Sequence, residues 1–302
     1  MNQTRIGLNL GHVRQAGVET PDTTRNAYRI AACPTADFAH RVFVIADSEP
    51  SKLARDYWLR ARRPLSSIVF LLPLLVIYEA GLQLVGATDP DAVRNGADYW
   101  MRGGLAMFGL SNSLLLPLIL VFGLFSWHVF RGDPWRVRTD TMVGMFAESV
   151  LFAGCLFAIG QVHNAMFASL PEIKELAVAA SPSVAIPTPL GSRVVSFIGA
   201  GVYEEVLFRL CLLPCVYGGC RLFGISPRAS AITSAAATGL VFAAAHHIGP
   251  AADTFSLFTF SFRTIAGVFF AGLFFTRGFG ITVGAHAAYD LLVGVLFASA
   301  GS

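Results

Sequence analysis

Long apolar stretches fill most of the chain from about residue 65 onward, and charged residues are sparse within them. Several approach or exceed the ~20 residues that a helix needs to cross ~30 Å of hydrocarbon. Leu, Phe, Gly and Ala dominate these stretches, as in helices that pack against one another in a bilayer. The pattern predicts seven membrane-spanning helices, over residues 65–86, 112–130, 141–162, 192–217, 228–247, 257–276 and 280–300.

The predicted fold is therefore an all-α, polytopic membrane helical bundle. Residues 249–256 interrupt the apolar pattern, because Gly249 and Pro250 break a helix. Phenylalanines that suit the headgroup boundary follow, at Phe255, Phe258, Phe260 and Phe262. We expect this segment to be re-entrant or interfacial, with an eighth short helix as the alternative.

The polar pattern divides the chain into three parts. Residues 1–55 are mixed and polar with no sustained period, and we expect them to be disordered. A start site placed too far upstream is an alternative, so membership of residues 1–50 in the mature protein stays open. Residues 56–190 hold N-terminal spans with few ionisable residues. Residues 191–302 concentrate such residues, and we expect the catalytic bundle there.

Composition agrees with a membrane protein. Of the 302 residues 54% are hydrophobic and 14% charged, and the mean hydropathy is +0.60, whereas soluble domains carry roughly 25% charged residues. The net charge of +3 comes without a continuous basic face, which argues against nucleic-acid binding. The five cysteines are odd in number and form no CxxC pair, so we interpret them as small apolar residues rather than a disulfide framework.

Lys and Arg cluster in the loops on one side of the predicted bundle, which indicates the cytoplasmic side. The opposing loops, around residues 89–98 and 172–189, are mixed or acidic, while Arg193 and Arg263 fall on that outer side against the rule. The prediction is a multi-pass protein of the cell (inner) membrane with a cytoplasmic N-terminus and bilayer lipid as a partner. The cytoplasmic cations are Lys52, Arg55, Arg60, Arg62, Arg63, Arg131, Arg136, Arg138, Arg221, Arg228 and Arg277.

Three charged residues stand in the middle of the fourth predicted span: Glu204, Glu205 and Arg209. A charge at the bilayer centre costs at least ~2.5–3.5 kcal/mol, so each requires a reason. Glu205 and Arg209 are four residues apart and share a helix face, which predicts an ion pair. Glu204 then points roughly 100° away and is free to face a cavity. The alternative is a purely structural network of all three.

Two further spans carry polar pairs at helical spacing. Phe242 and His246 are four apart in the fifth span, and His286 and Asp290 are four apart in the seventh. Each pair alone is compatible with a packing or hydrogen-bonding role. A bilayer offers such side chains no partners except one another or water, so we expect the three spans to converge on one site.

Hydrolysis is the chemistry that these side chains suit best. Glu204 can take a proton from water, His246 can hold that water, and His286 can stabilise the oxyanion that develops. Glu204, His246, His286 and Asp290 are equally candidate ligands of a divalent metal such as zinc, so a cofactor is either absent or a divalent metal. HExxH, GxSxG, Walker and dinucleotide-binding motifs are absent from the sequence.

The order Glu204-Glu205-x-x-x-Arg209, Phe242-x-x-x-His246 and His286-x-x-x-Asp290 resembles the three motifs of the CAAX proteases and bacteriocin-processing enzymes (CPBP, or Abi) family. That family includes the type II CAAX prenyl endopeptidases. The resemblance covers about residues 192–300. It implies a helical bundle with a conical intramembrane cavity and peptide-bond hydrolysis by a glutamate-activated water.

The resemblance also implies roles for individual residues. It assigns Glu204 and His246 to the water, and His286 with position 290 to the oxyanion. Glu205 and Arg209 match the supporting pair. Eukaryotic CAAX proteases are described with Asn where this chain has Asp290, so Asp290 is expected to be protonated, to orient His286, or to ligate a metal.

The predicted function is an intramembrane endopeptidase of glutamic or metallo type, with CAAX-type processing as one form. Its substrate would be a membrane-anchored or lipidated peptide or protein. One alternative is a non-catalytic immunity or scaffold protein of the same fold, since the family contains such members. Another is a proton-coupled transporter, because buried Glu, Arg and His also mark ion pathways.

Overall fold

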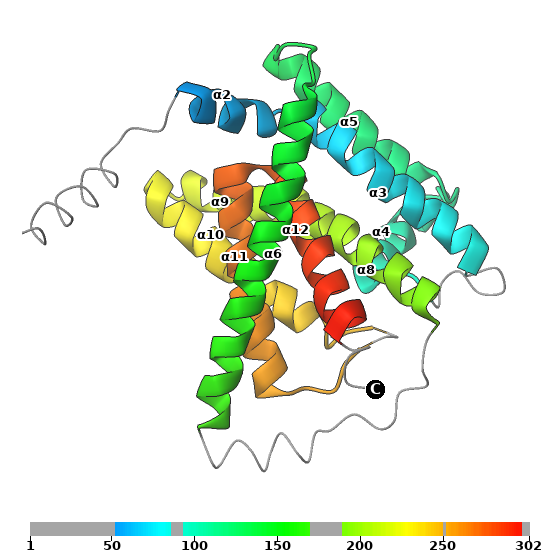
Figure 1. The fold of residues 1–302 in the computed structure, drawn as a ribbon, viewed down its shortest axis with the longest axis vertical. Coiled ribbons are helices and arrows are strands. Elements are labelled where there is room, and N and C mark those ends of the chain that lie inside the picture. Colours follow the sequence, from blue (N-terminus) through cyan, green and yellow to red (C-terminus); the bar gives the residue numbers. More distant parts are fainter. Residues whose placement is uncertain (1–51, 86–92, 170–188, 250–251, 298–302) are drawn as a thin grey trace, which may run out of the picture. The chain divides into compact units, whose positions relative to one another are not determined.

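The regular structure is entirely helical in the part of the chain that the computed structural model describes, residues 52–85, 93–169, 189–249 and 252–297 (Figure 1). The predicted all-α fold is confirmed. The expected disorder of the N-terminal segment falls mainly on residues 1–51, outside the described residues, as do most of the loop at 172–189 and the end of the last predicted span. Helix α2, Lys52–Ala61, begins inside the predicted segment 1–55.

Each of the seven predicted spans contains helix. Among the described residues, four helices are long and apolar enough to cross a bilayer by length and composition, which supports an integral membrane protein. A count of seven spans is not confirmed. The four are α3 (Pro64–Val85), α6 (Thr139–Ala168), α10 (Pro227–Ala245) and α11 (Leu257–Arg277). Shorter apolar helices are α5 (Leu115–Arg131) and α12 (Phe279–Leu291), which continues into the π-helix η3 (Leu292–Phe297).

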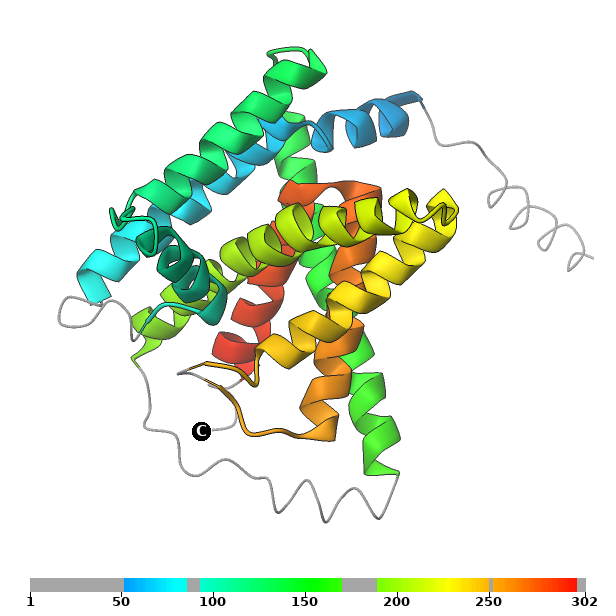
Figure 2. The same cartoon turned by 180° about the vertical axis from the view of Figure 1, so that it is seen from behind.

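The fourth predicted span forms one long rod with a change of helix type inside it. Helix α8, Leu190–Glu205, passes into the π-helix η2, Val206–Leu212, and then into α9, Leu213–Leu222. Figure 2 shows this rod crossing the bundle, with α10 folding back beside α9. A π turn inside an α-helix is rare and often accompanies a functional site. Here it begins directly after Glu204 and Glu205.

Two helices were not predicted from the hydropathy pattern. Besides α2, helix α4, Gly96–Ala106, begins within the outer loop predicted around residues 89–98 and ends before the second predicted span. Its N-cap Asn95 accepts a 2.8 Å hydrogen bond from the backbone nitrogen of Asp98. The alternative of an eighth helix at 249–256 finds no support in the described part of that segment, where the chain turns after His246 and runs without helix from Ala252 to Ser256.

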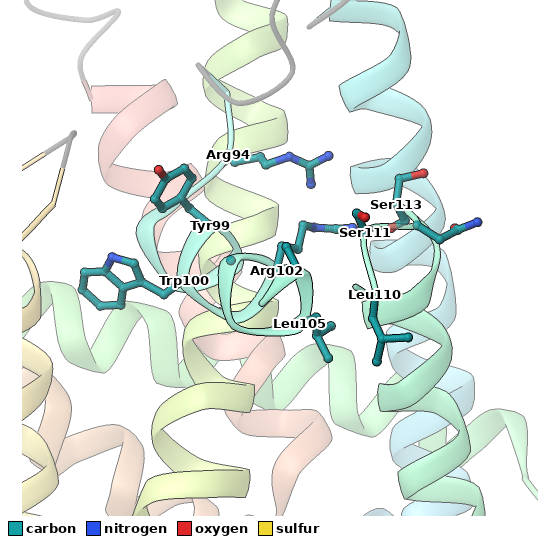
Figure 3. Close-up of a pocket in the computed structure, with 11 residues that line it drawn as sticks. Arg94, Tyr99, Trp100, Arg102, Leu105, Leu110, Ser111 and Ser113 are labelled. Atoms are coloured by element: carbon teal, nitrogen blue, oxygen red, sulfur yellow. Dashed lines mark hydrogen bonds between the residues drawn. The ribbon is translucent and has the colours of Figure 1, made fainter. Parts of the chain in front are cut away.

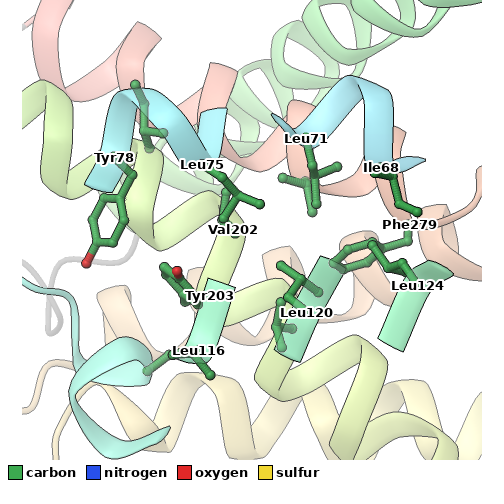
Figure 4. Close-up of a cluster of buried hydrophobic side chains, with 14 of the residues drawn as sticks. Ile68, Leu71, Leu75, Tyr78, Leu116, Leu120, Leu124, Val202, Tyr203 and Phe279 are labelled. Carbon is green, nitrogen blue, oxygen red and sulfur yellow. The ribbon is translucent and has the colours of Figure 1, made fainter. Parts of the chain in front are cut away.

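Apolar packing alone gives limited stabilisation in a bilayer, because lipid tails are as apolar as leucine. The largest buried cluster joins α3, α5 and α8, with Tyr78 and Tyr203 at one end of it (Figure 4). Large apolar side chains such as Phe122 and Phe146 remain exposed on the outside of the bundle, as expected where helices face lipid. Close helix approach and polar pairs must therefore hold the bundle together.

Small residues permit that close approach around α12 and α11. A side chain at Gly201 of α8 would lie 2.7 Å from the backbone nitrogen of Ala287 in α12. A side chain at Gly267 of α11 would lie 2.6 Å from the Cα atom of Gly239 in α10. Both contacts bring polar backbone and side-chain groups of the C-terminal helices near one another.

Polar pairs hold the two carboxylates of the N-terminal spans, Glu79 and Glu148. Glu79 of α3 accepts hydrogen bonds of 2.8 Å from both Arg102 of α4 and the Tyr203 hydroxyl of α8. Glu148 of α6 pairs with Arg277 of α11. Both carboxylates are therefore neutralised between helices, and one of the two networks ends on the residue that precedes Glu204.

Candidate active site

Three helices bring the predicted site residues together. Glu204 and Glu205 end α8, His246 follows the last residue of α10, and His286 and Asp290 lie on α12. Helix α12 packs against α8 and α11, and α10 packs against α11, so the three motifs share one interior. Each of these polar residues points into the bundle, as expected of groups that hydrocarbon cannot solvate.

Glu204 faces both histidines through one carboxylate oxygen. Its Oε2 atom lies 3.8 Å from Nε2 of His246 and 3.8 Å from Nε2 of His286. These distances exceed those of direct hydrogen bonds and suit groups that share a small bridging molecule. Glu204 itself is 9% exposed. The carboxylate is therefore enclosed with two imidazole nitrogens aimed at it.

The His246 ring is fixed by its own helix. Its Nδ1 atom lies 2.8 Å from the carbonyl oxygen of Phe242, one turn earlier, and because a carbonyl only accepts, Nδ1 must carry the proton. The Phe242 ring also meets the His246 ring at 4.9 Å between centroids, nearly edge-on. In the neutral ring the Nε2 atom is then the acceptor, and it faces Glu204.

His286 is held by a residue that the helical spacing did not suggest. Its Nδ1 atom donates to Oε1 of Glu205 over 2.7 Å, and its ring stacks on Phe270 with centroids 4.5 Å apart and an angle of 17°. The Nε2 atom is left facing Glu204 and Asp290, whose Oδ2 atom is 3.5 Å away. Glu205 rather than Asp290 therefore makes the close hydrogen bond to this imidazole.

Arg209 makes the ion pair that the sequence predicted. Its Nη1 atom lies 3.0 Å from Oε1 of Glu205, and its Nη2 atom donates to the carbonyl oxygen of Gly267 over 3.1 Å. The guanidinium is 1% exposed. Aromatic rings surround it at 4.8–5.8 Å from its central carbon, namely those of Phe208, Phe242 and Phe270. One Glu205 oxygen thus joins Arg209 to His286.

Comparison with known proteins agrees with the resemblance in the motifs. Residues 186–292, about a third of the chain, match the family described as type II CAAX prenyl endopeptidase Rce1-like. No curated protein and no solved structure matches the chain. The matched segment contains α8 to α12 and all six of the predicted site and supporting residues.

All four predicted metal ligands lie in the matched segment. Among the described residues, no three His, Cys, Asp or Glu side chains are arranged to hold one ion. The Nδ1 atoms of His246 and His286 are taken by Phe242 and Glu205, and Asp290 approaches only His286 closely. A ring that donates from Nδ1 still offers its Nε2 atom to a metal, and both Nε2 atoms face Glu204. No step below depends on a metal.

A cavity of about 450 Å³ lies outside the matched segment, over α4 (Figure 3). Its wall includes Arg94, Arg102, Tyr99 and Trp100, and it includes none of the predicted site residues. Arg94 and Arg102 both pair with Asp98, at 2.8 and 2.6 Å. The arginines of this cavity are therefore neutralised within the protein.

Proposed function

We propose that the protein is an intramembrane endopeptidase that hydrolyses a peptide bond with a water activated by Glu204. The observation that carries the proposal is the approach of both imidazole Nε2 atoms to one Glu204 oxygen at 3.8 Å. An enclosed carboxylate beside two oriented imidazoles is suited to general-base chemistry on a bound water. The match to the Rce1-like family supports a CAAX-type intramembrane protease in general.

In the proposed reaction, Glu204 and His246 activate the attacking water. Glu204 takes one proton from the water, and Nε2 of neutral His246 accepts a hydrogen bond from the other. The water oxygen attacks the carbonyl carbon of the scissile bond. Glu204 then passes its proton to the amide nitrogen, the C–N bond breaks, and a carboxylic acid and an amine form. The second proton of the water moves from the acid to the amine, so that the products leave as a carboxylate and an ammonium group.

The oxyanion of the tetrahedral intermediate needs a donor on the other side of the carbonyl. In its doubly protonated form His286 donates from Nδ1 to Glu205 and from Nε2 to the oxyanion. The Glu205 bond and the Phe270 stack hold that ring in place, so little reorganisation is needed when charge develops. Asp290, one turn along α12, orients the same nitrogen or donates as a protonated acid.

The substrate that we propose is a membrane-anchored peptide with a prenylated cysteine. The lipid would place the scissile bond at the depth of the site, which borders α10 and α11, two helices long enough to span the bilayer. The test is cleavage of such a farnesylated peptide by the purified full chain in lipid bilayers, with the products identified by mass spectrometry. A folded protein that cuts neither this peptide nor a library of membrane-anchored peptides would favour the non-catalytic alternative.

Chelation should leave this activity unchanged. We expect the cleavage rate after prolonged treatment with a strong zinc chelator to stay within about twofold of the untreated rate, because no step of the proposed chemistry uses a Lewis acid. The measurement is the initial rate before and after chelation, with a zinc metalloprotease treated in parallel as a positive control. Inactivation that zinc reverses would make the protein a metalloprotease.

Asp290→Asn should retain substantial activity. Asn fills nearly the same volume and its amide can donate to the oxyanion, so we expect kcat/KM to fall by less than about tenfold. The measurement is kcat/KM on the farnesylated peptide for both proteins at equal folded concentration. Loss of activity in Asp290→Asn that excess divalent metal restores would assign Asp290 to a metal instead.

A further inference from the structure

Arg263 lies on the face of α11 that borders the candidate site. It precedes Gly267 by four residues and Phe270 by seven, a spacing that places the three on one side of a helix. Gly267 accepts the hydrogen bond from Arg209, and Phe270 stacks on His286. Arg263 therefore occupies the next position along the site face, toward the end of α11 that follows His246 in the chain.

The partner of Arg263 ties it to the His246 turn. Its Nη2 atom pairs with the carboxylate of Asp253, whose backbone nitrogen donates to the His246 carbonyl oxygen over 2.9 Å. A cation is thus tied, through Asp253, to the turn that carries His246.

Arg263 keeps donor capacity for a ligand. Its Nη1 atom is enclosed and has no hydrogen-bond partner among the described residues, although a guanidinium can bind a carboxylate through two parallel bonds. Its side chain is 24% exposed, and that of Asp253 is 56% exposed. A ligand that approaches this ion pair can therefore contact Arg263, because the competing Asp253 carboxylate is more than half exposed to solvent.

The charges around the site make this arginine important for an anionic substrate. The carboxyl groups of Glu204, Glu205 and Asp290 gather at the site, and Asp253 lies at its edge. Arg209 is enclosed by aromatic rings and occupied by Glu205. Among the described residues, the His286 imidazolium is committed to the oxyanion, so Arg263 is the further cation at the site that an incoming anion can meet. Without it, an anionic group would face mainly carboxylates.

We propose that Arg263 binds the free C-terminal carboxylate of the peptide that is cut at Glu204. This inference rests on the proposed function and adds a specificity determinant to it. A peptide whose chain ends shortly after the scissile bond would be held at both ends, by its lipid in the bilayer and by its terminal carboxylate on Arg263. Peptides without that carboxylate would bind with the bond less well placed.

The test compares two farnesylated peptides that differ only in ending with a free carboxylate or a carboxamide. We expect the wild type to prefer the carboxylate by at least about tenfold in kcat/KM, the range of a charge-assisted hydrogen bond. Arg263→Gln should remove the preference by slowing cleavage of the carboxylate peptide alone. If the wild type cleaves both peptides equally, the role of Arg263 is refuted and the proposed function stands. If the wild type cleaves neither peptide, both the role of Arg263 and the proposed function are refuted.

Two further variants separate binding from structural support. Arg277→Gln is the matched control, because Arg277 lies on the same helix and pairs with Glu148 away from the site; it should keep the carboxylate preference. Asp253→Asn frees Arg263 and should keep or raise the preference. If Arg263 only stabilised the His246 turn through Asp253, Asp253→Asn and Arg263→Gln would each slow cleavage of both peptides. If Arg263→Gln does not fold, the wild-type ratio of kcat/KM for the two peptides and the effect of Asp253→Asn still test the role of Arg263.

Discussion

Glu204→Gln should lower kcat/KM by roughly 10²–10⁴-fold without unfolding the protein. Glutamine fills almost the same volume, and its amide cannot take a proton from water at neutral pH. Arg209 does not depend on Glu204, because its ion pair is with Glu205 at 3.0 Å. The expected result is therefore an inactive enzyme with a near-normal melting temperature, measured by single-turnover cleavage of the farnesylated peptide and by thermal unfolding in the same lipid.

The control for Glu204→Gln is Glu148→Gln. This change also removes a carboxylate from a spanning helix, but the carboxylate pairs with Arg277 and lies outside the proposed site. It should lower the melting temperature and leave kcat almost unchanged. Activity of Glu204→Gln within about tenfold of wild type would mean that another group activates the water.

Glu205→Gln should chiefly damage folding. Arg209 is 1% exposed and would be left as a buried charge without an anionic partner, a loss of about 3–5 kcal/mol in the free energy of unfolding for a broken buried pair. The His286 ring would also lose its charged acceptor at 2.7 Å. The measurement is the yield of folded protein and its unfolding in mixed micelles, compared with wild type.

The double variant Glu205→Gln with Arg209→Met separates the two effects. Removing the cation as well should recover part of the lost stability, because a neutral pair of similar volume carries no uncompensated charge. The melting temperature of the double variant should therefore exceed that of Glu205→Gln. A Glu205→Gln protein that is stable, well folded and fully inactive would give Glu205 a direct catalytic role instead.

Local spacing was enough to predict the interactions within one helix. The Glu205–Arg209 pair follows from their separation of four residues, and the structure confirms it at 3.0 Å. The same rule suggested His286 and Asp290 as partners, and their closest approach is 3.5 Å, which is long for a hydrogen bond. The shorter bond of His286 goes to Glu205, 81 residues earlier, and no periodicity in the chain signals that contact.

The hydropathy pattern predicted the long apolar helices and missed two short helices that carry charged residues. Helices α2 and α4 are short and carry charged residues, so an apolar pattern has no signal for them. The N-cap Asn95, which accepts from the nitrogen three residues later, was the one local sign of α4. The π turn after Glu205 also has no signal in the sequence, because its residues other than Arg209 are as apolar as those of an α-helical span.

The sequence by itself determined that this protein is helical, lies in a membrane and carries three polar motifs that hydrocarbon cannot solvate. The tertiary structure decided which groups satisfy one another. Close contacts such as Gly201 against Ala287 and Gly267 against Gly239 set the distances between helices. Those distances select Glu205 as the acceptor for Nδ1 of His286 and leave both Nε2 atoms facing Glu204, because orientation across helices depends on packing rather than on spacing along one chain.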